Sequence, residues 1–300
     1  MNAIEIRGLT KSFRGMHAVD NINMTVPVGA IYGFIGENGS GKSTTEKLIC
    51  GHLVPDKGEI KLFGKPYTDA GVRARVGALI ENAGCFPNSS VYANLMMQAL
   101  NLGLPNRVEE IQRVLKIVRM EDNAKIKFKS CSLGMKQRIG IAMALLGNPA
   151  LLILDEPING LDTDGMRIMR EIIVDITQNL GCTVLISSHI LGELEKIATH
   201  YGIIRQGKLI QEMSAQEMDA RSRVFVSVKT QDMAGALKVL QKKFGNVKLE
   251  EEYIRVYDVD DTESIVKCLL ENGHKVSEVD KNKVGLEEYY IELMSKKEEA

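Results

Sequence analysis

The chain of 300 residues has few cysteines and no excess of either charge. Its five cysteines are an odd number, lie far apart and form no CxxC pair. This spacing argues against a disulfide framework or a zinc site and favours reduced thiols in a cytosolic protein. The formal net charge is −1. With no overall basic surplus, nucleic acid is not expected as a partner.

A long apolar run is also missing. The longest candidate, residues 141–154, is interrupted by Gly147 and Pro149 and is too short to span a bilayer. The first residues, Met1 to Glu5, do not resemble the start of a signal or transit peptide. Since 44% of the residues are hydrophobic and 26% are charged, the composition is that of a globular protein. We therefore expect a soluble intracellular chain of one large or two medium domains.

Three short apolar runs predict central strands of a parallel sheet: residues 30–35, 151–154 and 183–186. Helical patterns at 166–180 and 190–198 lie near them, and strands alternating with helices indicate an α/β fold. We assign this first domain to residues 1–219.

A helical insert at about 83–147 interrupts the alternation. It contains three predicted helices, at residues 91–100, 108–118 and 136–146. We interpret it as a helical subdomain inserted between two strands of the sheet.

Residues 220–300 form a second predicted domain. Strand and helix patterns follow in the order β-α-β-β-α-β, with a last strand at 275–279, which is the order of a ferredoxin-like α+β unit. A helix at 286–294 follows, and the tail at 296–299 is expected to fray. This domain could bind a regulatory ligand, but no glycine loop or metal cluster stands out in it, so we favour an accessory or dimer-supporting role.

A phosphate-binding motif, G-x-x-x-x-G-K-[ST], directly follows the apolar run at 30–35. Its candidate ligand-binding residues are Gly36, Asn38, Gly39, Ser40, Gly41, Lys42, Ser43 and Thr44. Glycines let backbone N–H groups turn toward a phosphate, and the helix that follows adds its dipole. Lys42 would reach the β- and γ-phosphates, and the Ser43 hydroxyl would bind Mg²⁺. The alternative is a glycine-rich turn without a ligand, although a chance match has a probability of roughly one per cent.

Two carboxylates, Asp155 and Glu156, end the apolar run at 151–154. In a phosphoryl-transfer site, Asp155 can hold Mg²⁺ through water, and Glu156 can act as general base toward the attacking water. The alternative is a strand that merely ends in solvated acids, which is less plausible beside a phosphate loop on the same sheet.

Four further segments complete a recognisable pattern. The segment Cys131–Arg138 resembles the ABC signature, and Pro157–Asp162 resembles the D-loop. His189 lies at the switch-histidine position, and Phe13 lies where an aromatic residue stacks on adenine. From about residue 3 to 210, the chain thus resembles an ATP-binding subunit of an ABC transporter. This resemblance implies a P-loop NTPase fold, ATP and Mg²⁺ as cofactors, and Mg²⁺-dependent ATP hydrolysis.

The resemblance also implies partners. Two ATP-binding subunits would face each other head to tail, so that ATP on the phosphate loop of one is capped by Ser132 and Gly134 of the other, with Asp162 nearby. His189 would steady the γ-phosphate and the water near Glu156. Integral membrane permease subunits would hold the dimer at the inner face of the cell membrane.

Two departures from the common ABC pattern bear on the cargo. The signature keeps Ser132 and Gly134 but lacks the first glycine and the glutamine of LSGGQ, a form typical of bacterial exporters of antibiotics, bacteriocins and lantibiotics. Glu81 stands where the Q-loop glutamine is expected, as in lantibiotic self-immunity transporters. Glu81 could still bind Mg²⁺ or water, and we hypothesise that it links nucleotide state to the membrane partner. The alternative is a Gln-to-Glu change without functional meaning.

The sequence therefore predicts the ATP-hydrolysing subunit of a multicomponent exporter, for an antimicrobial peptide or a drug. A soluble ABC-type ATPase acting on ribosomes or DNA is the alternative, although such chains usually carry two phosphate loops or a long coiled-coil insertion. A P-loop kinase or GTPase is a further alternative, against which the signature-like segment argues. The motifs of the ATPase do not identify the cargo.

Overall fold

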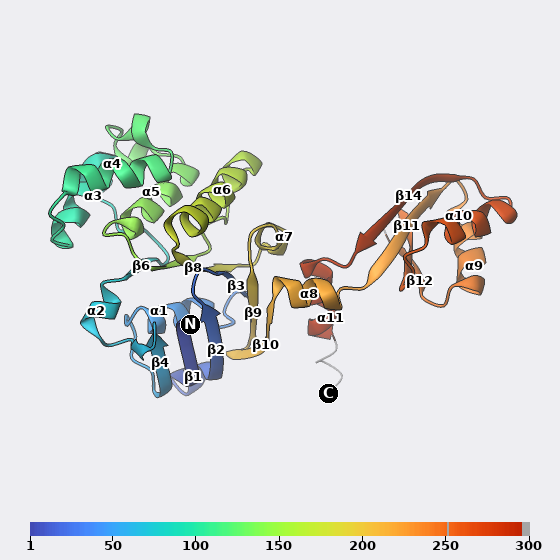
Figure 1. The fold of residues 1–300 in the computed structure, drawn as a ribbon, viewed down its shortest axis with the longest axis horizontal. Coiled ribbons are helices and arrows are strands. Elements are labelled where there is room, and N and C mark those ends of the chain that lie inside the picture. The colour runs from blue at the N-terminus through green and yellow to red at the C-terminus, as the bar shows by residue number, and fades with distance from the viewer. Residues whose placement is uncertain (251, 296–300) are drawn as a thin grey trace. The chain divides into compact units, whose positions relative to one another are not determined.

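The computed structural model describes residues 1–250 and 252–295, and the chain divides into two compact units, Met1–Ala215 and Gln216–Ala300. The sequence placed this division at 219/220. The predicted fraying at 296–299 lies outside the described residues. Within the described residues, no helix has both the length and the apolar character needed to cross a membrane. Figure 1 colours the two units from blue to yellow and from orange to red.

A six-stranded sheet forms the centre of unit 1, in the order β10-β9-β3-β8-β7-β6. Its strands are β3 (Ile31–Ile35), β6 (Val76–Leu79), β7 (Leu151–Asp155), β8 (Thr183–Ser188), β9 (His200–Arg205) and β10 (Lys208–Ser214). The three apolar runs became β3, β7 and β8, which are parallel neighbours at the middle of the sheet, as predicted. Because all three are covered on both faces, they require apolar side chains on both faces. Only β10 runs antiparallel to its neighbour.

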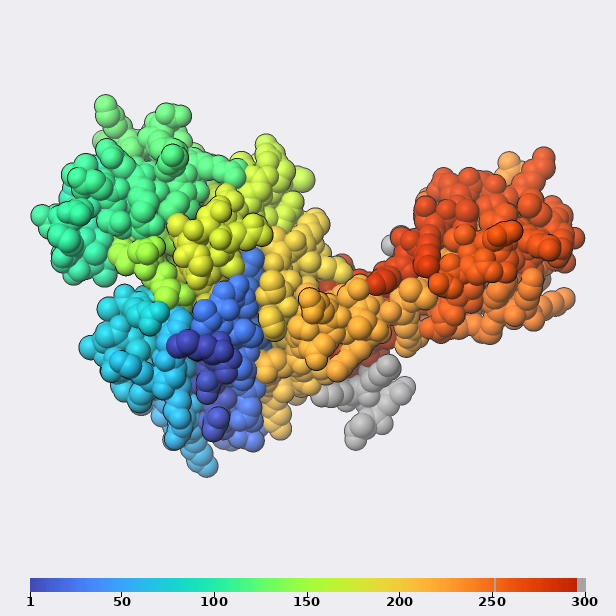
Figure 2. All heavy atoms as spheres, viewed as in Figure 1, coloured from blue at the N-terminus to red at the C-terminus, as the bar shows by residue number. Residues whose placement is uncertain are grey.

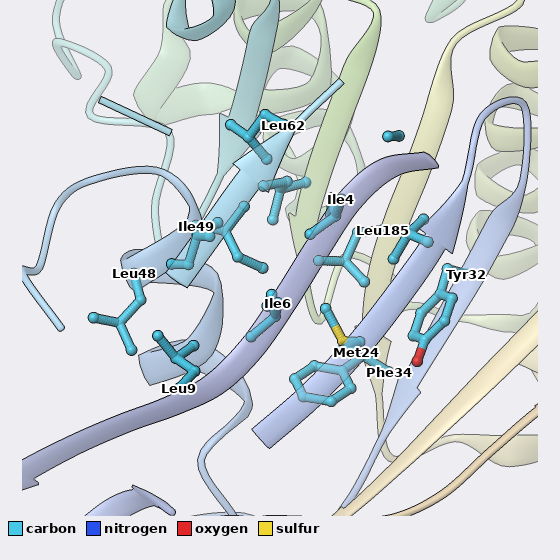
Figure 3. Packing of buried hydrophobic residues seen from close by; sticks show 14 of the residues in the cluster. Ile4, Ile6, Leu9, Met24, Tyr32, Phe34, Leu48, Ile49, Leu62 and Leu185 are labelled. Atoms are coloured by element: carbon cyan, nitrogen blue, oxygen red, sulfur yellow. The ribbon is translucent and has the colours of Figure 1, made fainter. Parts of the chain in front are cut away.

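A smaller antiparallel sheet, in the order β2-β1-β4-β5, belongs to the same unit. Its strands are β1 (Asn2–Phe13), β2 (Met16–Pro27), β4 (Lys57–Leu62) and β5 (Lys65–Pro66). The helix α1 (Lys42–Ile49) shares a core with both sheets. Figure 3 shows Ile4 and Leu9 of β1, Leu48 of α1 and Leu185 of β8 in this cluster. The phosphate loop that precedes α1 is thereby anchored to both sheets.

The helical insert lies between β6 and β7, as predicted. Its helices are α3 (Val91–Asn101), α4 (Arg107–Ile117) and α5 (Leu133–Leu145), and the other helices of the unit are α2 (Ala70–Arg73), α6 (Thr163–Leu180) and α7 (Leu191–Glu195). In Figure 2 the green atoms of the insert form one continuous lobe of unit 1. The helix predicted at 190–198 was too long. It ends at Glu195, since the Thr199 N–H donates to the Ile31 carbonyl at 2.8 Å and starts β9 beside β3.

Unit 2 confirms the ferredoxin-like prediction. Its elements are α8 (Ala215–Arg221), β11 (Val224–Thr230), α9 (Met233–Lys243), β12 (Val247–Glu250), β13 (Tyr253–Tyr257), α10 (Thr262–Glu271), β14 (Val276–Lys283) and α11 (Leu286–Ser295). The antiparallel sheet has the order β12-β13-β11-β14. Asp232 and Asp261 cap α9 and α10 by accepting hydrogen bonds from backbone N–H groups three residues on. The last strand continues to Lys283, beyond the predicted end at 279, because it pairs with β11 along its whole length.

Candidate active site

The phosphate loop leaves β3 after Ile35 and enters α1 through two glycines that no other residue could replace without movement. A Cβ on Gly36 would lie 2.5 Å from the Ile204 carbonyl oxygen, and one on Gly41 would lie 2.4 Å from the Ala18 carbonyl oxygen. Gly41 also has a φ of +111°, in the left-handed region. The sequence thus forces the loop into a tight turn with its backbone close to neighbouring strands.

The N-terminus of α1 is available to an anion. Gly41 is its N-cap, no side chain among the described residues caps it, and its first turn carries no acidic residue. The first N–H groups of a helix need acceptors, and the helix dipole makes this end positive. The buried Ser40 hydroxyl also lacks a hydrogen-bond partner in the described structure. These groups match the predicted phosphate cradle.

Lys42 places a positive charge inside this loop. Its Nζ donates to the Gly36 carbonyl at 2.6 Å and to the Glu37 carbonyl at 3.1 Å, and the residue is only 5% exposed. Glu156 Oε1 lies 3.6 Å from the same nitrogen. The ammonium group is thus held beside the loop that would receive the phosphates.

The acidic strand end is organised by Ser187 of β8. Its hydroxyl donates to Asp155 Oδ1 at 2.9 Å and accepts from the Glu156 N–H at 3.2 Å. The Glu156 N–H also reaches the Ser187 carbonyl at 3.2 Å. Glu156 has a φ of +49°, a left-handed conformation that costs energy for a residue with a side chain. These contacts with Ser187 orient the Asp155 carboxylate and fix the main chain at Glu156, at the end of the sheet.

Glu156 joins the phosphate loop to His189. Its Oε2 lies 2.8 Å from His189 Nδ1, and its Oε1 is buried without a hydrogen-bond partner in the described structure. Lys42, Glu156 and His189 follow three different strands yet form one connected set. A carboxylate with one buried oxygen that accepts no hydrogen bond has the chemistry of a base that accepts a proton from water.

Residues of the phosphate loop and the two carboxylates of the acidic strand end meet in one pocket, which we call the phosphate-loop pocket. It is lined by Ala18, Asn38, Gly39, Gly41, Lys42, Ser43, Thr44, Asp155 and Glu156. The hydroxyl of Ser43 and the carboxylate of Asp155 supply the hard oxygen ligands that Mg²⁺ prefers. The pocket therefore fits a magnesium–nucleotide complex, because it combines a loop that only glycine permits with oxygen donors for the metal.

One functional candidate, Glu46, was not predicted from the sequence. This α1 residue is fully buried, and neither carboxyl oxygen has a hydrogen-bond partner of normal geometry in the described structure. Burial, followed by the charge of Asp155, raises the pKa of Glu46 to about 8, although Ser187 and Lys42 oppose the shift. Its position four residues after Lys42, on the same helix face, was the available signal.

The signature and D-loop residues meet in a second pocket, which we call the signature pocket. Its lining includes Ser132, Gly134, Gly160, Leu161 and Asp162. Two of its polar residues cap helices: Ser132 accepts from the Met135 N–H at 3.3 Å to begin α5, and Asp162 accepts from the Gly165 N–H at 2.8 Å to begin α6. The helix predicted at 136–146 therefore begins earlier, at Leu133, because Ser132 is its N-cap.

The predicted site residues Glu81 and Phe13 line neither the phosphate-loop pocket nor the signature pocket. Glu81, with a φ of +63°, pairs with Lys47 Nζ of α1 at 2.6 Å, and its side chain is 63% exposed. The hydrogen bond from Lys47 lowers the pKa of Glu81. Phe13 is 46% exposed at the end of β1, with Lys11 Nζ 5.6 Å from its ring centroid.

Comparisons with known proteins bear on this site. A family model described as ABC transporter matches residues 19–159. The chain is 36% identical to the bacitracin transport ATP-binding protein BcrA of Bacillus licheniformis over 297 residues, covering 97% of both chains. The chain belongs to the ABC transporter family. It is also 40% identical to the lantibiotic transport ATP-binding protein SrtF of Streptococcus pyogenes over 209 residues, or 70% of this chain and 90% of the relative.

A solved structure shows the same fold. The ABC subunit cbiO1 of Clostridium perfringens, described as part of the transporter complex cbiONQ, aligns with a TM-score of 0.67 and 28% identity over 73% of this chain and 91% of its own. The predicted resemblance and the P-loop NTPase fold are confirmed. As an ABC ATPase, the chain binds ATP and hydrolyses it.

Proposed function

We propose that this ABC chain powers the export of an antimicrobial peptide, with self-protection or resistance as the result. Its support is the likeness, over 97% of both chains, to a protein named for bacitracin transport, and the shorter likeness to one named for lantibiotic transport. The form of the signature, with Ser132 and Gly134 retained, points to the same class of exporter.

The position of Glu156 carries the chemical part of the proposal. Its carboxylate lies between Lys42 and His189, at the end of the strand that also places Asp155. Glu156 would accept a proton from the attacking water, His189 would orient that carboxylate, and Lys42 would bind the β- and γ-phosphates. Ser43 and Asp155 would hold Mg²⁺, which neutralises phosphate charge when bound.

The separation of the two pockets supports a dimer. Ser132, Gly134 and Asp162 line the signature pocket and not the phosphate-loop pocket of the same chain. In a head-to-tail dimer, the signature pocket of each copy would close over ATP on the other. Phe13, exposed at the end of β1, would be free to stack on the adenine ring. ATP would thus hold the two copies together until hydrolysis.

The permease would bind at a cleft beside the helical insert, the insert cleft. This cleft is lined by Glu81, Cys85, Pro87, Phe128, Lys129 and Lys136, among others. Glu81 reaches from this cleft to Lys47 of α1, the helix that follows the phosphate loop. The contact is suited to couple nucleotide state to the permease, which would place the chain at the inner face of the cell membrane.

Recovery of the tagged chain from its native membranes in mild detergent tests this proposal. We expect a polytopic membrane protein to accompany it, and deletion of that partner to increase sensitivity to bacitracin or a lantibiotic. Recovery with ribosomes or nucleic acid, and without a membrane protein, would contradict it.

The coupling role of Glu81 has its own test. Glu81→Ala is expected to reduce resistance more than nucleotide binding, because the residue lines the insert cleft and not the phosphate-loop pocket. Equal losses in resistance and in nucleotide binding would contradict this role.

A further inference from the structure

Glu46 is a polar residue in apolar surroundings. Its neighbours on the buried face of α1 include Leu48 and Ile49, which belong to the core shared by the two sheets. The fold requires only a side chain of suitable volume at this position, and a buried carboxyl without regular hydrogen bonds costs stability. Where a sequence breaks a local rule at such a cost, the reason is often functional.

The surroundings of Glu46 identify the site concerned. The groups that act on its carboxyl are Asp155, Ser187 and Lys42. Helix α1 packs against β7, the strand that ends at Asp155. Glu46 does not itself line the phosphate-loop pocket. It therefore lies behind the residues that face the ligand, where it can act on the ligand only through them.

Ser187 is the link between Glu46 and those residues. Its hydroxyl donates to Asp155 Oδ1 and accepts from the backbone N–H of Glu156, so its orientation bears on the Asp155 carboxylate and on the main chain at Glu156. A hydroxyl has one proton to donate and two lone pairs that can accept, so Ser187 can accept a second hydrogen bond, from a protonated carboxyl behind it, while its own proton stays on Asp155.

We propose that Glu46 is a positioning residue: it holds the Ser187 hydroxyl and, through it, the Asp155 carboxylate in the orientation that a magnesium–nucleotide complex requires. This inference rests on the proposed binding of Mg²⁺ by Asp155. Partners that hydrogen-bond to a metal-binding carboxylate fix its direction, and their loss commonly weakens metal binding about 10- to 100-fold.

The test compares Glu46→Leu with Glu46→Gln in the full-length chain. The affinity for a nonhydrolysable ATP analogue is measured with excess Mg²⁺ and with EDTA, and the ratio of the two affinities reports the contribution of the metal. In Glu46→Leu, which cannot hydrogen-bond, we expect this ratio to fall about tenfold or more while the affinity in EDTA stays unchanged. Glu46→Gln, which can donate and accept, should keep most of the wild-type ratio.

Thermal unfolding of the same variants, without nucleotide, separates positioning from packing. Replacing an unsatisfied buried carboxyl by an apolar side chain of similar size should raise the melting temperature of Glu46→Leu. A residue with only a structural role would instead lower it. Ile49→Val, on the next turn of α1, is the matched control: it should lower the melting temperature and leave the magnesium ratio unchanged.

The outcomes distinguish this inference from the proposed metal site. If the wild-type ratio is near one, or if Asp155→Asn does not reduce it, the metal site and the role of Glu46 both fail. If Asp155→Asn reduces the ratio but Glu46→Leu keeps it, only the role of Glu46 fails. A parallel loss of affinity with and without Mg²⁺ in Glu46→Leu, or an equal fall of the ratio in both Glu46 variants, also overturns that role.

Discussion

The phosphate-loop pocket and the signature pocket lie in the same unit but are built by different means. In the first, charged side chains approach one another, and a residue with a side chain is held at positive φ: Lys42 and Glu156 are 3.6 Å apart, and Glu156 has a φ of +49°. In the second, Ser132 and Asp162 each accept one backbone hydrogen bond that begins a helix.

This difference indicates that the two pockets have different functions. The phosphate-loop pocket combines a buried cation and two carboxylates, one of which also contacts His189, and these are groups that acid–base chemistry needs. The lining of the signature pocket offers two helix caps, three glycines, the apolar Leu133 and Leu161, and the charged Arg138 and Asp164. A surface of this kind can accept a partner's nucleotide, but it supplies no general base positioned as Glu156 is.

The largest expected effect lies in the phosphate-loop pocket. In Glu156→Gln, the amide cannot accept the proton of water, so the hydrolysis rate should fall about 10²- to 10⁴-fold while ATP still binds. Phosphate release measures hydrolysis, and size-exclusion chromatography with ATP should show accumulated dimers. Near-normal turnover would remove Glu156 as the base.

A smaller effect is expected from the cation of the same pocket. Lys42→Met keeps the buried stem but loses the charge, and charge-assisted hydrogen bonds to phosphate are worth about 1.5–3 kcal/mol each. Nucleotide affinity should therefore fall about 10- to 100-fold, as measured by calorimetric titration. The matched control, Lys47→Met, removes a more exposed lysine of the same helix and should bind normally. Equal losses in both variants would contradict a local role for Lys42.

The signature pocket is tested by Gly134→Ala. A Cβ there would lie 3.6 Å from Leu161 Cδ2, an ordinary contact, so the single chain should fold and bind nucleotide as before. In a closed dimer the added methyl group would meet the partner's nucleotide, and overpacking of this kind should weaken ATP-dependent dimerisation about tenfold. Loss of nucleotide affinity in the monomer would show that the two pockets are not separate.

The smallest effect is expected at Glu81, which belongs to neither pocket. Its ion pair with Lys47 is exposed, and exposed pairs contribute little to stability. Glu81→Gln should therefore leave the melting temperature and nucleotide affinity within measurement error, as followed by thermal unfolding and titration. A clear loss of nucleotide affinity would instead assign Glu81 to the phosphate-loop pocket, as the sequence had suggested.

The sequence was sufficient to predict those features whose residues lie close together along the chain. The phosphate loop between β3 and α1, the carboxylates at the end of β7 and the β-α-β-β-α-β order of unit 2 all depend on patterns within a few residues. Apolar runs, glycine positions and helix caps act locally, so they can be recognised without knowing the fold. The assignment of the family followed from several such motifs in the right order.

Only the tertiary structure decided which of these residues meet. Along the sequence, Glu46 and Ser187 are separated by most of unit 1, yet Ser187 affects the pKa of Glu46. The pairing of Glu81 with Lys47 likewise depends on how the segment after β6 approaches α1. Such contacts arise from the packing of distant segments, which periodicity along the chain does not encode. The amino-acid sequence by itself thus determined the chemistry that is present, while the packing of α1 against the two sheets decided that a carboxyl lies behind the acidic strand end.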